Sequence, residues 1–170
     1  MARLPRNCRI LSFILFVSLY ANAQTDSTKL VKEINDQVWK PFTAYIISGD
    51  NTGLSTLHSK RIARVQIDQN SIIDYDKYFP AGSKEKWQLP ENTTRFFELR
   101  FDKRICNGNK AWESGYYKGG LQKEGKEVQS YYGRFYVVLE KENDIWKIVV
   151  DADTGAGATE ENFKNAAALY

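Results

Sequence analysis

Residues 131–154 have the sequence YYGRFYVVLEKENDIWKIVVDADT, which contains two strand patterns separated by a turn at Glu142-Asn143-Asp144. On both sides of the turn, apolar and polar residues alternate with the two-residue period that is typical of β-strands. The second strand is expected to have an apolar face and a largely charged face, which hold Trp146, Ile148, Val150 and Ala152 and, opposite them, Lys147, Val149, Asp151 and Asp153. This stretch therefore predicts a long antiparallel hairpin.

More strands are predicted upstream, at 94–106, 110–118 and 127–141. The Asn107-Gly108 pair between the first two is a strong hairpin signal, because both residues tolerate the positive φ that tight turns need. Strand 94–106 is expected to place Phe97, Leu99, Phe101 and Ile105 on one face and Glu98, Arg100, Asp102 and Arg104 on the other. A shorter hairpin is predicted at 61–68 and 71–73.

The first part of the chain is predicted to be helical. Residues 26–48 have apolar side chains at three- and four-residue steps, namely Leu30, Ile34, Val38, Phe42, Tyr45 and Ile46. Gly49 provides a stop, and Pro41 is expected to kink or weaken the helix because it lacks a backbone donor. Short helices are expected at 52–58, within 74–89, and from Thr159. Helices followed by a run of antiparallel strands indicate an α+β domain with helices packed on one face of a curved sheet.

The N-terminus has the pattern of a cleavable secretory signal. Three arginines and no acidic residue precede a mostly apolar run over 10–20, which is much shorter than the roughly 20 residues of a membrane-spanning helix. Ala21-Asn22-Ala23 provides small residues at the cleavage positions. We therefore expect export to the periplasm or the medium, with cleavage between Ala23 and Gln24 and a single domain over 24–170.

Removing that signal changes the charge of the chain. The signal contains three of the 24 basic residues and none of the 21 acidic ones, so the mature chain has 21 of each and is formally neutral. A neutral chain offers no support for nucleic acid or an anionic membrane surface as a partner. Cys106 would be the only cysteine left, so no disulfide can form within one mature chain, and burial of this thiol is the favoured interpretation.

Five segments, in this order and spacing, resemble a known family: Val38-Trp39-Lys40-Pro41-Phe42, Gly49-Asp50, Leu57-His58-Ser59, 131–139 and 146–154. Together they are similar to the nuclear transport factor 2-like superfamily, in particular its SnoaL-like branch of small bacterial domains of unknown function. The resemblance covers nearly all of residues 30–163. It implies a cone: a strongly curved antiparallel sheet, also described as a cystatin-like roll, wrapped around the long first helix, with an apolar cavity open at one end.

Members of this superfamily include isomerase-like and cyclase-like enzymes as well as pocket proteins and association domains, so the fold leaves the function open. The enzymes need a carboxylate near the cavity and hydrogen-bond donors for a developing enolate. The candidate carboxylates are Asp151, Asp153, Glu98 and Glu113, and the candidate donors are Tyr117, Tyr132 and Tyr136. If the apolar face of the last strand lines the cone, Asp151 and Asp153 point away from it. Ala152 also departs from the family pattern, which has an aromatic residue or a histidine near these acids.

The other candidates are cavity-lining residues. The resemblance implies that His58 lies near the side of the cavity, and the aromatic residues are interpreted as core and cone lining: Trp39, Phe42, Tyr45, Trp112, Tyr136 and Trp146. No metal site is predicted, because one histidine and one cysteine cannot form a zinc site and 151–162 departs from a calcium loop at several positions. No cofactor is predicted.

Three functions remain open from the sequence. The first is an exported pocket protein that binds a small, largely apolar molecule and forms a homodimer through the sheet. The second is an isomerase or cyclase that uses one carboxylate and a tyrosine. The third is a non-catalytic association module, which predicts a cavity filled by its own aromatic side chains.

Overall fold

The computed structural model describes residues 27–81 and 88–169; the predicted signal, 1–23, and Trp87 lie outside them. Residues 27–34 are helical and continue into a π-helical turn. The following elements are η1 (Asn35–Trp39), α2 (Lys40–Ser48), α3 (Asn51–Thr56), β1 (His58–Gln66), η2 (Ile67–Gln69), β2 (Ser71–Ile73), α4 (Tyr75–Tyr78), β3 (Thr93–Asn107), β4 (Lys110–Lys123), β5 (Gln129–Glu142), β6 (Ile145–Thr154), α5 (Glu160–Asn165) and β7 (Ala167–Ala168). Within the described residues, no helix is both long and apolar enough to cross a membrane.

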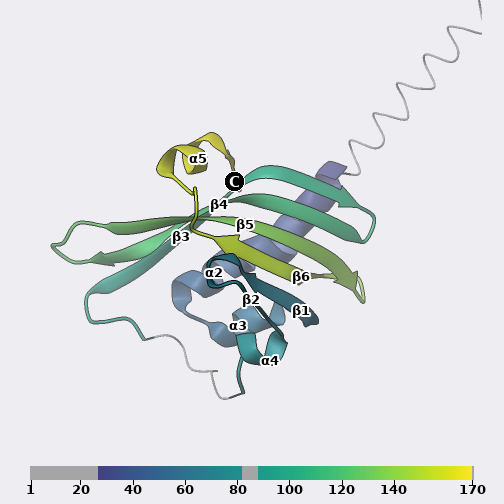
Figure 1. Ribbon diagram of the computed structural model, residues 1–170, viewed down its shortest axis with the longest axis horizontal. Coiled ribbons are helices and arrows are strands. Elements are labelled where there is room, and N and C mark those ends of the chain that lie inside the picture. The colour runs from purple at the N-terminus through teal and green to yellow at the C-terminus, as the bar shows by residue number, and fades with distance from the viewer. Residues whose placement is uncertain (1–26, 82–87, 170) are drawn as a thin grey trace, which may run out of the picture.

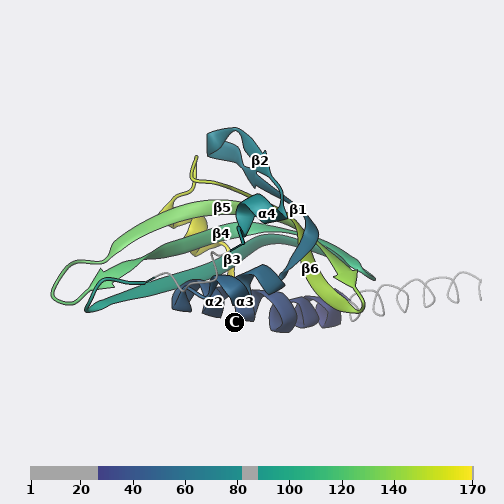
Figure 2. The same cartoon turned by 90° about the horizontal axis from the view of Figure 1, so that it is seen from below.

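The strands form one seven-stranded sheet in the order β2-β1-β6-β5-β4-β3-β7. The sheet arches over the N-terminal helix, which lies along its concave side (Figures 1 and 2). This arrangement confirms the predicted α+β fold with a curved sheet around a long helix. The sheet is mixed rather than wholly antiparallel, because β1 pairs with β6 in parallel, and it does not close into a barrel.

The N-terminal helix accommodates Pro41 by a local change of hydrogen bonding. The backbone N–H of Lys40 donates to the carbonyl oxygen of Asn35, five residues earlier, so the turn before the proline is wider than an α-helical turn. Pro41 then occupies the first turn of α2, where its missing donor costs least. The helix ends as predicted at Gly49, which has a φ of 70°.

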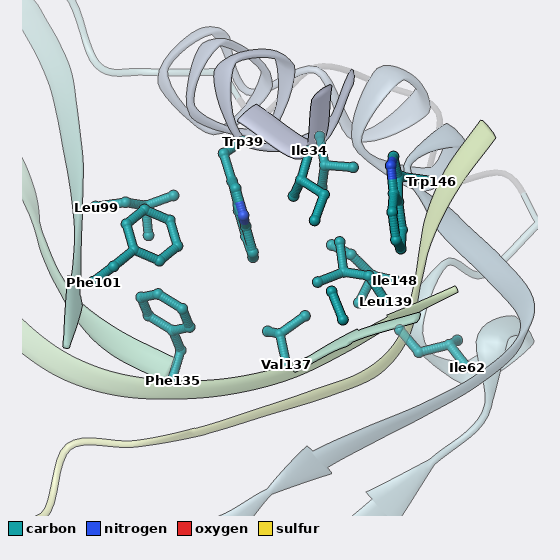
Figure 3. Close-up of a cluster of buried hydrophobic side chains, with 12 residues drawn as sticks. Ile34, Trp39, Ile62, Leu99, Phe101, Phe135, Val137, Leu139, Trp146 and Ile148 are labelled. Carbon is teal, nitrogen blue, oxygen red and sulfur yellow. The ribbon is translucent and has the colours of Figure 1, made fainter. Parts of the chain in front are cut away.

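Trp39 projects from this helix into the middle of the core (Figure 3). On one side its indole packs against Phe101 and Phe135, with ring centroids 5.6 and 5.7 Å away. The other part of the core, around Trp146 and Ile148, lies toward the turn between β5 and β6 and is fully buried. Burying side chains of this size is the main source of the free energy that holds the helix on the sheet.

Two β-bulges change which side chains face the helix. Asp102 is an extra residue on β3, between the pairs Phe101–Gly115 and Lys103–Ser114. Val149 is an extra residue on β6, between the pairs of Ile148 and Val150 with β5. Each extra residue shifts the alternation of side chains by one position.

The predicted face assignments for these two strands are therefore wrong beyond the bulges. On β3, Arg104 faces the concave side and Ile105 is 52% exposed on the convex side. On β6, Ile148 and then Asp151 and Asp153 face the concave side. A strict two-residue period through either strand predicts the opposite.

The last residues wrap around the outer edge of β3. Thr159 caps α5 through a capping box, and Phe163 of this helix is buried against Tyr132 on the convex face. β7 then pairs with β3 at Arg100 and Phe101, and Leu169 packs against the core. The predicted C-terminal helix is confirmed, whereas β7 has no counterpart in the sequence-based prediction.

Candidate functional site

A cavity of about 240 Å³ lies between the helix and the concave side of the sheet. Its apolar wall comes from η1, α2, β3, β5 and β6, and includes the aromatic and aliphatic residues Trp39, Phe42, Phe97, Leu99, Phe135, Val137 and Ile148. These residues belong to the core or pack against it, so the cavity is continuous with the hydrophobic interior (Figure 3). The volume is slightly below the range of about 300–1,000 Å³ for sites that hold drug-sized molecules.

The opposite wall is polar and is formed by β1, β4, β6 and α4. Arg64 of β1 lies at the centre of this wall. Its Nη2 atom is 2.6 Å from Asp153 Oδ1, and its Nη1 atom is 3.7 Å from Asp151 Oδ1. Nη1 also donates to the carbonyl oxygens of Val65 and Asp151, at 3.2 and 3.1 Å. Arg64 and Asp151 are both almost buried, with side chains 11% and 12% exposed. Parallel pairing of Arg64 with Asp151 across β1 and β6 brings these groups together.

Two tyrosines complete the polar wall, and each donates to one of the acids. The hydroxyl of Tyr78, on α4, donates to Asp151 Oδ2 at 3.3 Å. The hydroxyl of Tyr117, on β4, donates to Asp153 Oδ2 at 3.2 Å. Both phenol groups are therefore fixed by the acids rather than directed into the cavity.

Burial and the neighbouring acids raise the pKa of both tyrosines above the ordinary value. Burial alone would raise the pKa of the Asp151 carboxyl, but its contacts with His58 and the positive charge of Arg64 outweigh burial and lower that pKa. Burial alone would likewise lower the pKa of Arg64, but the negative charges of Asp151 and Asp153 outweigh it and raise the pKa. The carboxylate of Asp151 is thus held in its charged form, which suits binding of a positive group better than proton abstraction.

His58 lies behind the polar wall. Its Nδ1 is 2.9 Å from the carbonyl oxygen of Leu54, and its Nε2 is 3.7 Å from Asp151 Oδ2. The ring is fully buried among Phe42, Tyr78 and Phe79. His58 is therefore a neighbour of Asp151 outside the cavity lining, with Nε2 beyond hydrogen-bond distance of the carboxylate.

Glycines on β4 and β5 allow tyrosine rings to lie across the neighbouring strand. A Cβ atom on Gly133 would lie 2.0 Å from Cζ of Tyr117, and one on Gly119 would lie 2.7 Å from Cζ of Tyr131. Gly133 and Tyr117 are direct cross-strand partners, as are Gly119 and Tyr131. The absence of a side chain at Gly133 thus lets Tyr117 reach Asp153 and stack on Phe97.

The predicted cavity-lining residues separate into three groups. Trp39 and Phe42 line the cavity, and His58 is adjacent to it through Asp151. Tyr45 packs outside the cavity on Gly53, and Trp146 is buried in the core. Trp112 and Tyr136 lie on the convex face, because the next residue on each strand, Glu113 on β4 and Val137 on β5, faces inward.

Of the catalytic candidates, the structure brings Asp151, Asp153 and Tyr117 together on the cavity wall. Glu98 is exposed beside Lys118 of the next strand, and Tyr132 packs on Phe163 across the convex face. Arg64 and Tyr78, which complete the site, were not predicted. One signal in the sequence could have identified Arg64: it lies between Ala63 and Val65 in a strand that is otherwise half apolar.

Glu113 faces inward but does not reach the cavity. It is fully buried, and it accepts hydrogen bonds from Trp39 Nε1 and from Arg104 Nε, the latter at 2.8 Å. Arg104 also donates to Asn35 Oδ1 at 2.7 Å. This network joins the π-helical turn to the sheet and uses the indole donor of Trp39. Among the described residues, no group of three or more histidine, cysteine or acidic side chains is arranged to hold a metal ion.

No protein-family model matches the sequence, and no curated protein matches it either. Several solved structures are similar in fold. A nuclear transport factor 2-like superfamily protein from Salmonella enterica is 17% identical, with a TM-score of 0.55 over 75% of this chain and 92% of that one. The association domain of CaMKII from C. elegans is 14% identical, with a TM-score of 0.55 over 76% of this chain and 98% of that one.

A ketosteroid isomerase-like protein from Erwinia carotovora is 7% identical, with a TM-score of 0.51 over 71% of this chain and 92% of that one. At these identities the likeness concerns the fold alone. The chain has the nuclear transport factor 2-like fold, as the resemblance in its sequence implied.

Proposed function

We propose that this protein binds a small molecule with a largely apolar body in the cavity between α2 and the sheet. The observation that supports this proposal is the cavity itself, which has about 240 Å³ of space and two chemically different walls. A non-catalytic association module predicts a cavity that is filled by the protein's own aromatic side chains, and these side chains leave this space open. An apolar wall provides binding free energy, and a few fixed polar groups provide orientation, which is the usual composition of a ligand site.

Intrinsic tryptophan fluorescence provides a test, because Trp39 lies on the cavity wall. We expect a lipid, sterol and polyketide panel to contain compounds that change the emission saturably. The same compounds should give a smaller signal with Trp39→Phe. Silence across the panel at high ligand concentration would count against the proposal.

Acid–base catalysis by a cavity carboxylate is a second candidate, since Asp151 and Asp153 both lie on the wall. The hydrogen-bond donors of the site fit this candidate less well than the carboxylates do, because the hydroxyls of Tyr78 and Tyr117 already donate to those acids. An enzyme of the isomerase type would need these donors for its substrate oxygen. Deuterium exchange at the α-carbon of a ketone panel tests this candidate; exchange that Asp153→Asn abolishes would favour it over simple binding.

We also propose that the protein is exported and that the mature chain begins at Gln24. The support is the sequence of residues 1–23, with its arginines, apolar run and Ala-x-Ala site. Expression of the full chain in a bacterial host should give a periplasmic or secreted product whose mass corresponds to residues 24–170. A product that keeps residues 1–23 would contradict this proposal.

A further inference from the structure

We infer that the ligand of the cavity carries a protonated amine, bound beside Asp151 and Asp153, on a small ring-bearing apolar body. This inference rests on the proposed binding function and specifies the chemistry of the ligand. Three observations support it: how the wall's hydrogen-bond donors are used, the charge of the polar wall, and the aromatic rings around it.

The first observation concerns donors. Four side chains on the cavity wall donate to protein acceptors: Trp39 to Glu113, Tyr78 to Asp151, Tyr117 to Asp153, and Arg64 to Asp153 and two backbone carbonyls. Arg95, at the other rim, donates to the carbonyl oxygen of Ile46 at 2.9 Å. A ligand that accepted hydrogen bonds from these groups would have to break the bonds they already make; Arg64 Nε, which is buried without an acceptor among the described residues, is the exception.

Acceptors, in contrast, remain for a ligand. Asp151 Oδ1 lies 3.7 Å from Arg64, which is beyond hydrogen-bond distance. Asp153 Oδ2 accepts one bond, from the hydroxyl of Tyr117, and a carboxylate oxygen has a second lone pair. The polar wall therefore matches a ligand group that donates hydrogen bonds.

The second observation concerns charge. The polar wall contains the two carboxylates of Asp151 and Asp153 but one guanidinium, that of Arg64, which contacts both. Arg95 is on β3, which is three strands away from β6 in the sheet. With Arg95 counted, the cavity lining has two carboxylates and two guanidinium groups, but both carboxylates lie at the wall formed by β1 and β6, where Arg64 is their cationic partner. An ammonium group at that wall can form charge-assisted hydrogen bonds with the carboxylates.

The third observation concerns the rings beside the acids. Tyr78 and Tyr117 bond to the acids, and Phe97 stacks on Tyr117 with ring centroids 5.6 Å apart. Aromatic faces attract cations, and the guanidinium of Arg64 already lies over the Tyr78 ring, 5.3 Å from its centroid, so the rings of Tyr117 and Phe97 are the ones that remain for an ammonium group. Phe42 and Trp39 then continue the aromatic surface toward the apolar end of the cavity, where they suit a ring.

The test is a matched series that differs only in the head group: 3-phenylpropylamine, 3-phenylpropan-1-ol and 3-phenylpropanoate, titrated by calorimetry at pH 7. We expect the amine to bind at least about tenfold more tightly than the carboxylate, with the alcohol between them. Asp153→Asn, which keeps an oxygen for Arg64, should reduce the preference for the amine severalfold. Asp102→Asn is the matched control, because Asp102 also pairs with an arginine, Arg134 at 2.9 Å, but on the convex face.

The outcomes separate this inference from the proposed function. Equal binding of all three compounds, or tighter binding of the carboxylate, would overturn the inference while leaving ligand binding in place. A preference that Asp102→Asn reduces as much as Asp153→Asn would also overturn it. If neither the matched series nor the apolar panel binds, both the inference and the proposed binding function are overturned. If Asp153→Asn does not fold, as judged by circular dichroism, the order of affinities in the wild-type protein alone decides.

Discussion

Glu113 is the most deeply buried acidic side chain among the described residues, and its two bonds tie the first helix to the sheet. We expect Glu113→Gln to lower the free energy of unfolding by about 3 kcal/mol, because removing one partner of a buried ion pair leaves the other uncompensated. Urea denaturation measures the change. Glu160→Gln, in the exposed pair with Lys164, is the control and should leave stability unchanged. Equal effects of the two variants would contradict this account of the network.

The lowered pKa of the Asp151 carboxyl leads us to expect a specific dependence of the free energy of unfolding on pH. Its pKa is lowered in the folded protein, so its charged form contributes stability above the unfolded value of about 3.9, and that contribution is lost as the pH falls through the folded value. Asp151→Asn lacks this contribution and should be less stable by about 2 kcal/mol at neutral pH, since Arg64 keeps Asp153. The difference should shrink below about pH 4. Denaturant titrations at pH 3 and pH 7 measure it, and a difference that is the same at both would contradict the assignment.

At the scale of the elements, periodicity predicted the long helix, the stop at Gly49 and the β3–β6 meander, but it could not place the acids. The extra residues Asp102 and Val149 reverse the alternation within single strands, and neither is a glycine or proline that would mark a bulge in the sequence. The cavity acids therefore follow from tertiary structure. The parallel pairing of β1 with β6, which brings Arg64 to Asp151, also joins segments that are far apart in the chain.

Cross-strand pairing of Gly133 with Tyr117 gives an element-scale prediction. We expect Gly133→Ala to displace the Tyr117 ring, break its bond to Asp153, and lower stability by about 1–3 kcal/mol, because the new methyl group overlaps the ring. A crystal structure and a denaturation curve of the variant would measure both effects. Gly155→Ala is the control, since its Cβ would lie 3.6 Å from the nearest atom, Asp68 Oδ2, in ordinary contact. An unmoved Tyr117 ring in Gly133→Ala would contradict the role given to this glycine.

At the scale of the whole molecule, we propose that the convex face mediates a homodimer. The cross-strand row Ile105, Trp112, Val138 and Val150 crosses this face and includes Ile105, which is 52% exposed. Burying such a row between two copies would remove apolar surface from water. Sedimentation should show a dimer at micromolar concentration that Trp112→Glu converts to a monomer. Ile72→Glu, at an exposed position of the edge strand β2, should leave the dimer intact. A wild-type monomer would contradict this proposal.

Two neighbouring valines on β5, Val137 and Val138, test whether the cavity between α2 and the sheet binds a ligand. Val137 lines the cavity, whereas Val138 lies on the convex face. We predict that Val137→Phe fills the cavity and weakens binding of any hit from the panel, or of 3-phenylpropylamine, at least about tenfold, the order of effect expected when about 1.4 kcal/mol of binding free energy is lost. Val138→Phe should bind as the wild type does. Calorimetric affinities that fall equally in the two variants, or in neither, would contradict the claim that the ligand occupies this cavity.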